Sequence, residues 1–265
     1  MIVLFLLKEV HLLNILFVGD VVGQTSCDYL CSQLPKIKRE NSVDLTIVNG
    51  ENSADGNGIT PYSANLLLNG GADIITTGNH SFRRREMNDM YEESNVIIRP
   101  ANFGDTYGKG YCIADMGRTQ VAVINLLGMA YMDNCDNPFH CIDKILKEID
   151  TPNIIVDFHA EATSEKKAMG YYLEGRVSAV LGTHTHVQTN DEEILSGHTG
   201  YITDVGMVGS KRSILGIDKD VIISRLTTYY PQKHTYPGGE IMINAVILII
   251  DEKNGKCTAI KKINL

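Results

Sequence analysis

The sequence contains no apolar run of the roughly 20 residues that a membrane-spanning helix needs. Its N-terminus begins with only seven apolar residues, MIVLFLL, which are followed by the charged Lys8 and Glu9. A signal peptide would add a basic flank before this run and a cleavage site of small residues after it, and neither is there. We therefore predict an N-terminal extension over residues 1–13, a single domain over residues 14–265, and no membrane association.

Positive charge is also scarce, because 24 Lys and Arg are set against 32 Asp and Glu, for a net charge of −8. This balance argues against broad binding of nucleic acid, although local charge still governs the binding of a small anionic substrate. None of the six cysteines forms a C-x-x-C pair. We therefore expect reduced thiols in a cytoplasmic protein. The composition leaves open whether the chain forms a homo-oligomer.

Short apolar segments alternate with amphipathic ones through the first two thirds of the chain. Continuous apolar strands spaced by helices predict a sheet that is covered on its faces. The last third is expected to be strand-rich and antiparallel, with a tight hairpin turn at Asn254-Gly255, which makes the whole a mixed α/β domain. The predicted strands are residues 15–18, 45–48, 73–76, 121–125, 154–156, 178–181, 220–227, 241–250 and 257–263, and the predicted helices are residues 25–41, 62–70, 83–92, 139–149 and 163–174.

Five of the predicted strands are each followed at once by a residue that can bind a metal ion. In sheets of this kind, functional groups gather beyond the carboxyl ends of the strands, where glycines let the backbone turn sharply. A single Asp in such a place is often a helix cap, and a single His is often a hydrogen-bonded core residue. Five in succession favour a shared site instead. The candidates are Asp20, Glu51 with Asn52, Asn79 with His80, His159, and His184 with His186.

Two of the eight histidines, His184 and His186, stand one residue apart in the segment LGTHTHVQ. Side chains at positions i and i+2 of an extended segment point the same way. Both imidazoles are therefore expected to project from one edge toward one small volume. The alternative for this segment alone is a pair of exposed loop histidines, and the other four strand ends favour the ligand interpretation.

The candidate ligands are carboxylate, amide and imidazole groups, without a thiolate. This set suits Mn, Fe, Zn or Ni better than a structural zinc bound by cysteine. There are more candidates than one ion needs, which favours two ions, and the two oxygens of Glu51 could bridge them. Such a pair of ions attracts phosphate and lowers the pKa of bound water.

These residues resemble the calcineurin-like metallophosphoesterase superfamily through GD, GNH and GTHTH. More narrowly, the chain is similar to the YmdB-type phosphodiesterase family. The resemblance implies a four-layer αββα sandwich, a binuclear metal centre that is often iron, with manganese or zinc as alternatives, and hydrolysis of cyclic nucleotides, notably 2′,3′-cyclic ones. The motifs that carry it are NILFVGDVVG, NGENSADGNGI, TTGNH, RPANF, VDFHAEATSEK, GTHTHVQT and YITDVGM, in this order over residues 14–250.

The resemblance also implies roles for the candidate residues. His80 would donate a proton to the leaving oxygen while a metal-bound hydroxide attacks the phosphorus of a small anionic phosphodiester. Asp20 departs from the wider superfamily, where an Asp-x-His is usual, because Val21 and Val22 follow it. The resemblance places Asp20, Glu51, Asn52 and His186 around one ion and Glu51, Asn79, His159 and His184 around the other, with Glu51 as the bridge.

Other features of the sequence leave alternatives open. Arg99 and Asn102, in the loop RPANFGDTYGKG, are candidate substrate contacts, and a well-packed surface loop is the other interpretation. Residues 227–239 could form a wall of the pocket or a subunit contact. A phosphomonoesterase or nucleotidase on the same scaffold is the second functional hypothesis. A regulatory protein with a structural metal site is the third, and His80 argues against it because a structural site needs no proton donor.

Overall fold

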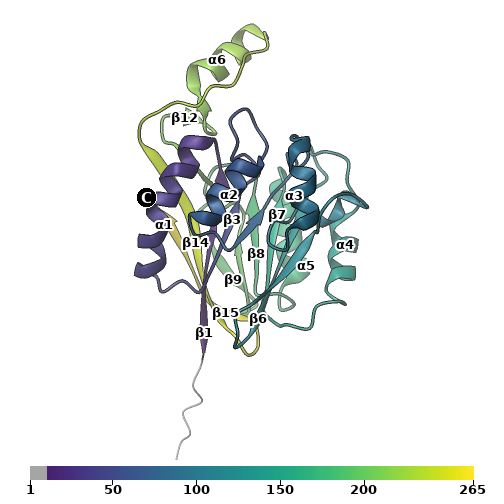
Figure 1. The fold of residues 1–265 in the computed structure, drawn as a ribbon. Coiled ribbons are helices and arrows are strands. Elements are labelled where there is room, and N and C mark those ends of the chain that lie inside the picture. The colour runs from purple at the N-terminus through teal and green to yellow at the C-terminus, as the bar shows by residue number, and fades with distance from the viewer. Residues whose placement is uncertain (1–10) are drawn as a thin grey trace, which may run out of the picture.

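The computed structural model describes residues 11–265, which form two β-sheets packed face to face between two outer layers of helices (Figure 1). This arrangement confirms the expected α/β fold with four αββα layers. The N-terminal residues 1–10, most of the predicted extension, lie outside the described residues. Within residues 11–265, none of the helices combines the length and the apolar character that a membrane crossing requires.

The first sheet has seven strands in the order β2-β11-β14-β1-β3-β4, with β15 paired to β14. Strands β1, β3 and β4 run parallel, so their carboxyl ends reach the same edge of the sheet. Strand β14 is antiparallel to β1. The strands are β1 (Leu12–Val18), β2 (Asp20–Val21), β3 (Leu45–Asn49), β4 (Ile74–Thr76), β11 (Met207–Ser210), β14 (Ile241–Asp251) and β15 (Lys256–Asn264).

The second sheet has six strands in the order β5-β6-β7-β8-β10-β9. Its central strands β6, β7, β8 and β10 are parallel. A separate two-stranded hairpin pairs β12 (Ser213–Ile214) with β13 (Ile217–Asp218). The strands of the second sheet are β5 (Tyr111–Asp115), β6 (Gln120–Leu127), β7 (Ile154–His159), β8 (Ala179–Thr183), β9 (Glu193–Leu195) and β10 (Thr199–Ile202).

Strand β1 shows how the layers are held together, because its side chains alternate between two cores. Leu13, Ile15 and Phe17 are buried between the two sheets. Leu16 and Val18 point the other way, into the core beneath the helices of the first sheet. A strand that is apolar on both faces therefore lies inside the sandwich, as the continuous apolar run predicts.

The helices cover both outer faces. Helices α1 and α2 pack on the first sheet, and α4 and α5 pack on the second. Each of these helices is amphipathic and packs its apolar face on the sheet that it covers. The helices are α1 (Gln24–Glu40), α2 (Pro61–Asn69), α3 (Asn88–Glu93), α4 (Pro138–Ile145), α5 (Thr163–Leu173) and α6 (Lys219–Thr228), with short 3₁₀ turns η1 (Arg85–Met87) and η2 (Ala101–Phe103).

The prediction of a strand at residues 220–227 is wrong, because this segment forms helix α6. Asp218 caps the helix by accepting a hydrogen bond from the backbone N–H of Asp220, and Tyr229 ends it in the left-handed conformation with φ 61°. None of its residues is buried, and Ile223 and Leu226 are exposed. The β-branched residues suggested a strand, but no strand pairs with this segment, so local capping decides the conformation. The helix projects from the top of the molecule (Figure 1).

The first strand begins before the predicted start of the domain. Strand β1 starts at Leu12, where the sequence placed the boundary between residues 13 and 14, and Leu13 pairs with Ile250 of β14. The hairpin between β14 and β15 is confirmed, with Asp251 opposite Lys256 and therefore a four-residue turn that contains Asn254-Gly255. Gly255 adopts a φ of 72°, which glycine tolerates better than other residues do.

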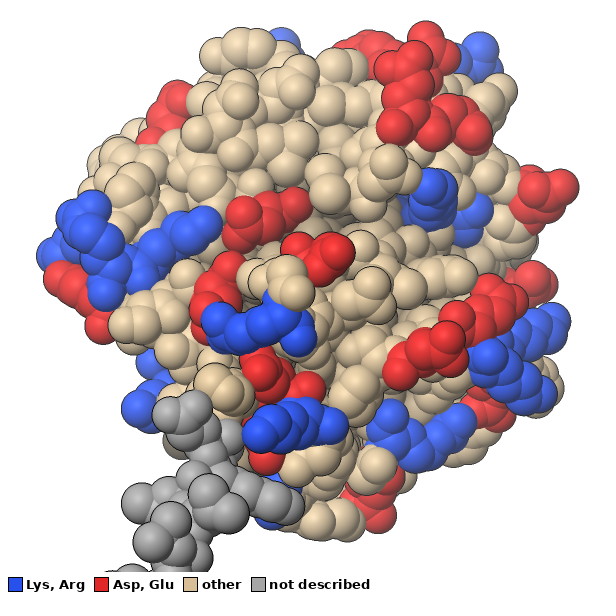
Figure 2. Space-filling view, turned by 60° about the horizontal axis from the view of Figure 1, so that its bottom comes forward, with Lys and Arg blue, Asp and Glu red and all other residues tan. Residues whose placement is uncertain are grey.

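The end of the molecule where β1 begins carries charges of both signs. In the view of Figure 2, Lys and Arg side chains are interspersed with Asp and Glu and do not gather into one patch. Arg118 illustrates the pairing, because its guanidinium lies 2.6 Å from Glu252 and 3.4 Å from Asp44. This guanidinium joins the turn between β5 and β6 to the opposite sheet.

The start of the domain can be tested by comparing two adjacent leucines. Leu13→Ala removes a fully buried side chain and should lower the free energy of unfolding by about 2–5 kcal/mol. Leu12→Ala changes an exposed side chain and should cost no more than about 0.5 kcal/mol. Urea unfolding of the two variants measures the difference. Equal small effects would place the domain boundary after Leu13, as the sequence suggested.

Candidate metal centre and active site

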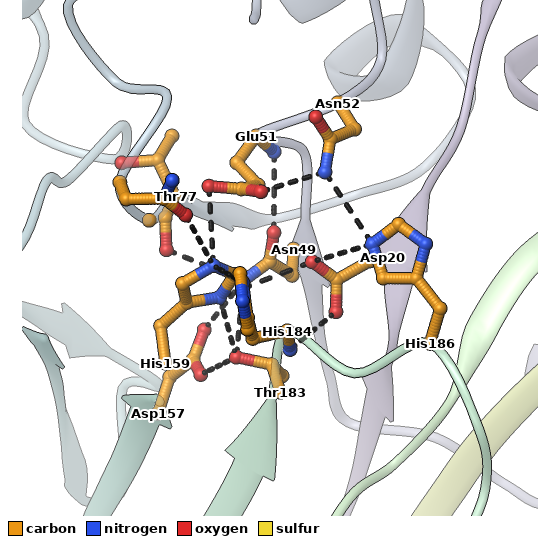
Figure 3. Close-up of polar contacts among 12 residues, drawn as sticks. Asp20, Asn49, Glu51, Asn52, Thr77, Asp157, His159, Thr183, His184 and His186 are labelled. Atoms are coloured by element: carbon orange, nitrogen blue, oxygen red, sulfur yellow. Dashed lines mark hydrogen bonds and ion pairs between the residues drawn. The ribbon is translucent and has the colours of Figure 1, made fainter. Parts of the chain in front are cut away.

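The segments that follow five strands meet at one end of the two sheets, where the predicted ligands lie together (Figure 3). Three of these segments belong to the first sheet and two to the second, so the site straddles both. Asp20 begins β2, Glu51 and Asn52 follow β3, Asn79 and His80 follow β4, His159 ends β7, and His184 and His186 follow β8.

Four potential ligand atoms converge beside the ring of His159. Its Nε2 lies 3.2 Å from Oε2 of Glu51, 3.2 Å from Oδ1 of Asn79 and 3.1 Å from Nδ1 of His184. A proton on that nitrogen would satisfy only one of these three neighbours. One carboxylate oxygen, one amide oxygen and two imidazole nitrogens fit a divalent cation of the borderline class.

A second group of ligand atoms surrounds Asp20. Its Oδ1 is buried without a hydrogen-bond partner and lies 3.6 Å from Nε2 of His186. The side-chain amide of Asn52 lies 3.4 Å from the same Nε2 and 2.6 Å from Oε1 of Glu51. A buried carboxylate oxygen with no partner is rare in proteins, and a cation at this point would supply one. Asp20, His186 and Oε1 of Glu51 therefore fit a second metal position, to which Asn52 presents its amide nitrogen while its Oδ1 faces His80.

Glu51 belongs to both groups. Its Oε2 faces His159, and its Oε1 faces Asn52. The carboxylate is fully buried. This is the arrangement that a bridging carboxylate needs, because each oxygen would face a different ion.

The buried charges shift the pKa values of the ligands. Burial raises the pKa of Glu51, but the neighbouring His159 and His80 hold it well below its usual range. Burial lowers the pKa of His159, yet Glu51 and Asp20 raise it overall to about 9. Burial and the adjacent His159 lower the pKa of His184 to about 3, so this imidazole is neutral and offers a free lone pair.

The two histidines of GTHTH reach the site by a different backbone path from the expected one. His184 has a φ of 99° and His186 a φ of 63°, so the segment is not extended. Each imidazole consequently joins a different group, with His184 beside His159 and His186 beside Asp20. A positive φ is unfavourable for a residue with a Cβ and persists where the surroundings enforce it.

A buried ion pair enforces this backbone. Asp204 accepts hydrogen bonds from the backbone N–H and the hydroxyl of Thr185, at 3.0 Å and 2.7 Å. The same carboxylate pairs with Lys166 at 2.7 Å, and both side chains are only 1% exposed. Neither residue was predicted as a site residue from the sequence, although Lys166 lies in the motif VDFHAEATSEK and Asp204 in YITDVGM.

Another buried chain of hydrogen bonds orients His159. Its Nδ1 donates to the hydroxyl of Thr183 at 2.9 Å, and that hydroxyl donates to Asp157 at 2.7 Å. Asn49 donates to the other oxygen of Asp157 at 3.0 Å. This leaves Nε2 of His159 free to act as a ligand, the usual role of such supporting groups in metal sites. Burial raises the pKa of Asp157 to about 6.

A cavity of about 370 Å³ opens beside the ligands. His80 lines it and turns away from Asn79, which faces His159. Nδ1 of His80 lies 2.9 Å from Oδ1 of Asn52 and 3.1 Å from Glu51, while its Nε2 lies 3.1 Å from the amide of Asn57. Asn57 therefore contacts the predicted proton donor and also lines the cavity. It was not predicted as a site residue from the sequence.

Arg99 and Asn102, the candidate substrate contacts, do not line this cavity. The Arg99 guanidinium donates hydrogen bonds to backbone carbonyls of its own loop, including those of Pro100 and Gly104. The Asn102 side chain is buried and donates to the carbonyls of Leu127 and Asp136. Both side chains hold the backbone of the loop through these hydrogen bonds. We therefore replace their expected role as substrate contacts with this structural one.

Residues of the C-terminal third complete the cavity. His234 and Tyr236 lie in the 227–239 segment and line it. These two residues of the segment therefore form part of the pocket wall. The cavity is also lined by four of the predicted ligands, Glu51, Asn52, His184 and His186, and by Val22, Glu161, Thr185, Leu215 and Ile217.

Comparison with known proteins gives consistent matches along most of the chain. The family model described as YmdB-like protein matches residues 16–263. A 2′,3′-cyclic-nucleotide 2′-phosphodiesterase of Bacillus subtilis is 44% identical over 254 residues, which cover 95% of this chain and 96% of the relative.

Two solved structures are also similar. A hypothetical protein from Thermus thermophilus superposes with a TM-score of 0.90 at 37% identity, covering 96% of this chain and 99% of the other. A novel phosphatase from Mycoplasma pneumoniae superposes with a TM-score of 0.91 at 28% identity, covering 97% of this chain and 94% of the other.

The bridging position of Glu51 predicts a distinctive metal content. The wild-type protein should bind about two transition-metal ions per chain. Glu51→Ala should reduce both sites, because one oxygen faces each group of ligands. Asn79→Ala and Asn52→Ala are the matched controls, and each should weaken one site while the other stays filled. Elemental analysis after gel filtration measures the content. A full complement in Glu51→Ala would contradict the bridging assignment.

Proposed function

The chain belongs to the YmdB-like family, and from its site we propose that it is a two-metal phosphodiesterase that opens 2′,3′-cyclic nucleotides to 3′-nucleotides. One observation carries this proposal: His80 lines the cavity beside both groups of ligands without belonging to either. A structural metal site has no use for such a group. The activity in the name of the Bacillus subtilis relative supports the choice of substrate.

The reaction breaks the bond between phosphorus and O2′ of the ribose. Water adds to the phosphorus, O2′ leaves with a proton from His80, and the product carries a 3′-phosphate and a free 2′-hydroxyl. Two bound divalent cations would hold the phosphate oxygens and lower the pKa of the attacking water. The residues that would hold them are Asp20, Glu51, Asn52 and His186 for one and Glu51, Asn79, His159 and His184 for the other.

The surroundings of His80 suit a proton donor. Its Nδ1 faces Oδ1 of Asn52 and the carboxylate of Glu51, which both accept hydrogen bonds and so fix the ring. Its Nε2 lies beside Asn57 in the cavity wall, and this nitrogen would carry the proton for the leaving oxygen. An alkoxide such as O2′ leaves poorly without this proton, and general acid catalysis commonly contributes about 10²–10⁴-fold to the rate.

We also propose iron as the metal, with manganese or zinc as alternatives. The oxygen and nitrogen ligands, without a thiolate, support a metal of this group. A cytoplasmic location is proposed as well, and it is supported by the six cysteines, all of which are free thiols.

A phosphomonoesterase is the second candidate, because the similar Mycoplasma pneumoniae structure is described as a phosphatase. Hydrolysis of a substrate panel by the metal-loaded protein separates the two. We expect 2′,3′-cyclic AMP to be converted into 3′-AMP, and AMP to release inorganic phosphate much more slowly. Chromatography of the nucleotide products measures both the rate and the bond that breaks. Faster phosphate release from AMP would favour the phosphomonoesterase.

The role of His80 can be separated from metal binding. His80→Ala should keep both metal ions and lose about 10²–10⁴-fold in turnover of 2′,3′-cyclic AMP. Bis(4-nitrophenyl) phosphate should be affected far less, because 4-nitrophenolate leaves without a proton. His140→Ala, at an exposed histidine of α4, is the control and should change neither rate. Equal losses on the two substrates, or loss of metal in His80→Ala, would overturn the assignment.

A further inference from the structure

The cavity has a second kind of lining that the phosphodiester chemistry does not use. Beside the polar residues around the metal ligands, it is lined by Val22, Leu215, Ile217, His234 and Tyr236. No Lys or Arg occurs among its lining residues in the described part of the chain. Binding energy from this region must therefore come from apolar and aromatic contact and not from additional ion pairs with phosphate.

This apolar lining is attached directly to the metal site. The hairpin of β12 and β13 turns through Leu215, whose backbone carbonyl accepts a hydrogen bond from Nδ1 of His186 at 3.1 Å. That bond leaves Nε2 of His186 facing Asp20. Leu215 thus positions the predicted ligand His186 through its backbone carbonyl and also lines the cavity.

Close packing holds the hairpin against the first sheet. Gly216 has a φ of 90°, and a Cβ there would lie 2.4 Å from Cγ1 of Val22, so only glycine fits. The hairpin therefore touches Val22, which follows Asp20 in the chain by two residues. Its place at the top of the molecule, below α6, is visible in Figure 1.

Tyr236 is anchored from another direction. Its hydroxyl accepts a hydrogen bond from the backbone N–H of Gly56 at 2.9 Å. Its ring lies against Gly23, where a Cβ would approach Cδ1 of the ring to 3.0 Å. The neighbouring carbonyl of Thr235 accepts from the N–H of Asp218 at the end of β13. The ring is thus held between the loop after β3 and the hairpin, as a preorganised surface.

We propose that Val22, Leu215, Ile217 and Tyr236 form the nucleobase subsite of this enzyme, with His234 beside them. The proposal rests on the proposed function and extends it from the phosphate to the rest of the substrate. A 2′,3′-cyclic nucleotide has one charged end and one flat heteroaromatic end, which matches a cavity with one polar and one apolar lining. Its volume lies within the range of small-molecule sites.

The chemistry of this surface also sets its selectivity. Every base has a π-face, so stacking on aromatic and apolar side chains tolerates any base, and it changes affinity by about 5-fold to 150-fold. The enzyme should therefore depend strongly on the presence of a base and only weakly on its identity.

The test compares a nucleotide with an analogue that has no base. For the metal-loaded wild-type protein, kcat/KM on 2′,3′-cyclic AMP should exceed that on methyl riboside 2′,3′-cyclic phosphate by about 5-fold to 150-fold. Leu215→Ala and Tyr236→Ala should each lower this ratio severalfold, mainly through KM for the nucleotide. Tyr236→Phe keeps the ring and should retain the ratio. Tyr230→Ala, at an exposed tyrosine outside the cavity lining, is the matched control.

Equilibrium binding gives a second readout that does not need turnover. Calorimetry should show 3′-AMP binding more tightly than methyl riboside 3-phosphate to the wild type, with a smaller difference in Leu215→Ala and Tyr236→Ala. Equal kcat/KM and equal affinity for the two compounds in the wild type would overturn the subsite while leaving the proposed function intact. An unchanged ratio in both variants would also overturn it. Failure to hydrolyse either cyclic ester would overturn the proposed function itself and the subsite with it.

Discussion

The contact between Glu51 and His159 joins the two sheets at the point where the chemistry is proposed. One residue follows β3 of the first sheet and the other ends β7 of the second, and both are fully buried. A carboxylate removed from water is stabilised only where opposite charges or hydrogen-bond donors surround it. Histidines from the other strand ends supply this environment, so the packing of the two sheets and the assembly of the site depend on the same few atoms.

This constraint has structural consequences behind the ligands. Bringing His184 and His186 to different groups of ligands requires two positive φ angles within three residues. These backbone angles persist because Asp204 accepts a hydrogen bond from the N–H of Thr185, which lies between the two histidines. Lys166 pairs with Asp204 and compensates its buried charge. A buried ion pair contributes little to stability by itself. Its value here lies in fixing one backbone conformation that the ligands need.

Much of this could be predicted from the sequence, because parallel strands deliver their carboxyl ends to a common edge. The apolar runs identified β1, β3, β4, β7 and β8, and the polar residues after them are the ones that the structure brings together. Helix α6 could not be predicted in this way, since its β-branched residues favour a strand, whereas no strand pairs with the segment and its caps at Asp218 and Tyr229 set the helix. From the sequence, Arg99 and Asn102 are polar residues of a loop with no visible partner. Only their contacts in the structure show that both side chains donate hydrogen bonds to backbone carbonyls.

The polar and the apolar lining of the cavity differ in how clearly the sequence predicts them. Strand ends hold the groups around the phosphate, and their spacing is visible in the sequence because the sheet imposes it. The hairpin around Leu215 and the segment that carries Tyr236 belong to no sheet that packs into the core, so no periodic pattern marks them. They are held at the cavity by local contacts instead: the carbonyl of Leu215 with His186, Gly216 with Val22, and Tyr236 with Gly56 and Gly23. The side chains of Leu215 and Tyr236 can change without removing the hydrogen bond that holds His186, because the backbone carbonyl of Leu215 makes it. These two positions are therefore where substrate selectivity can diverge while the reaction stays the same.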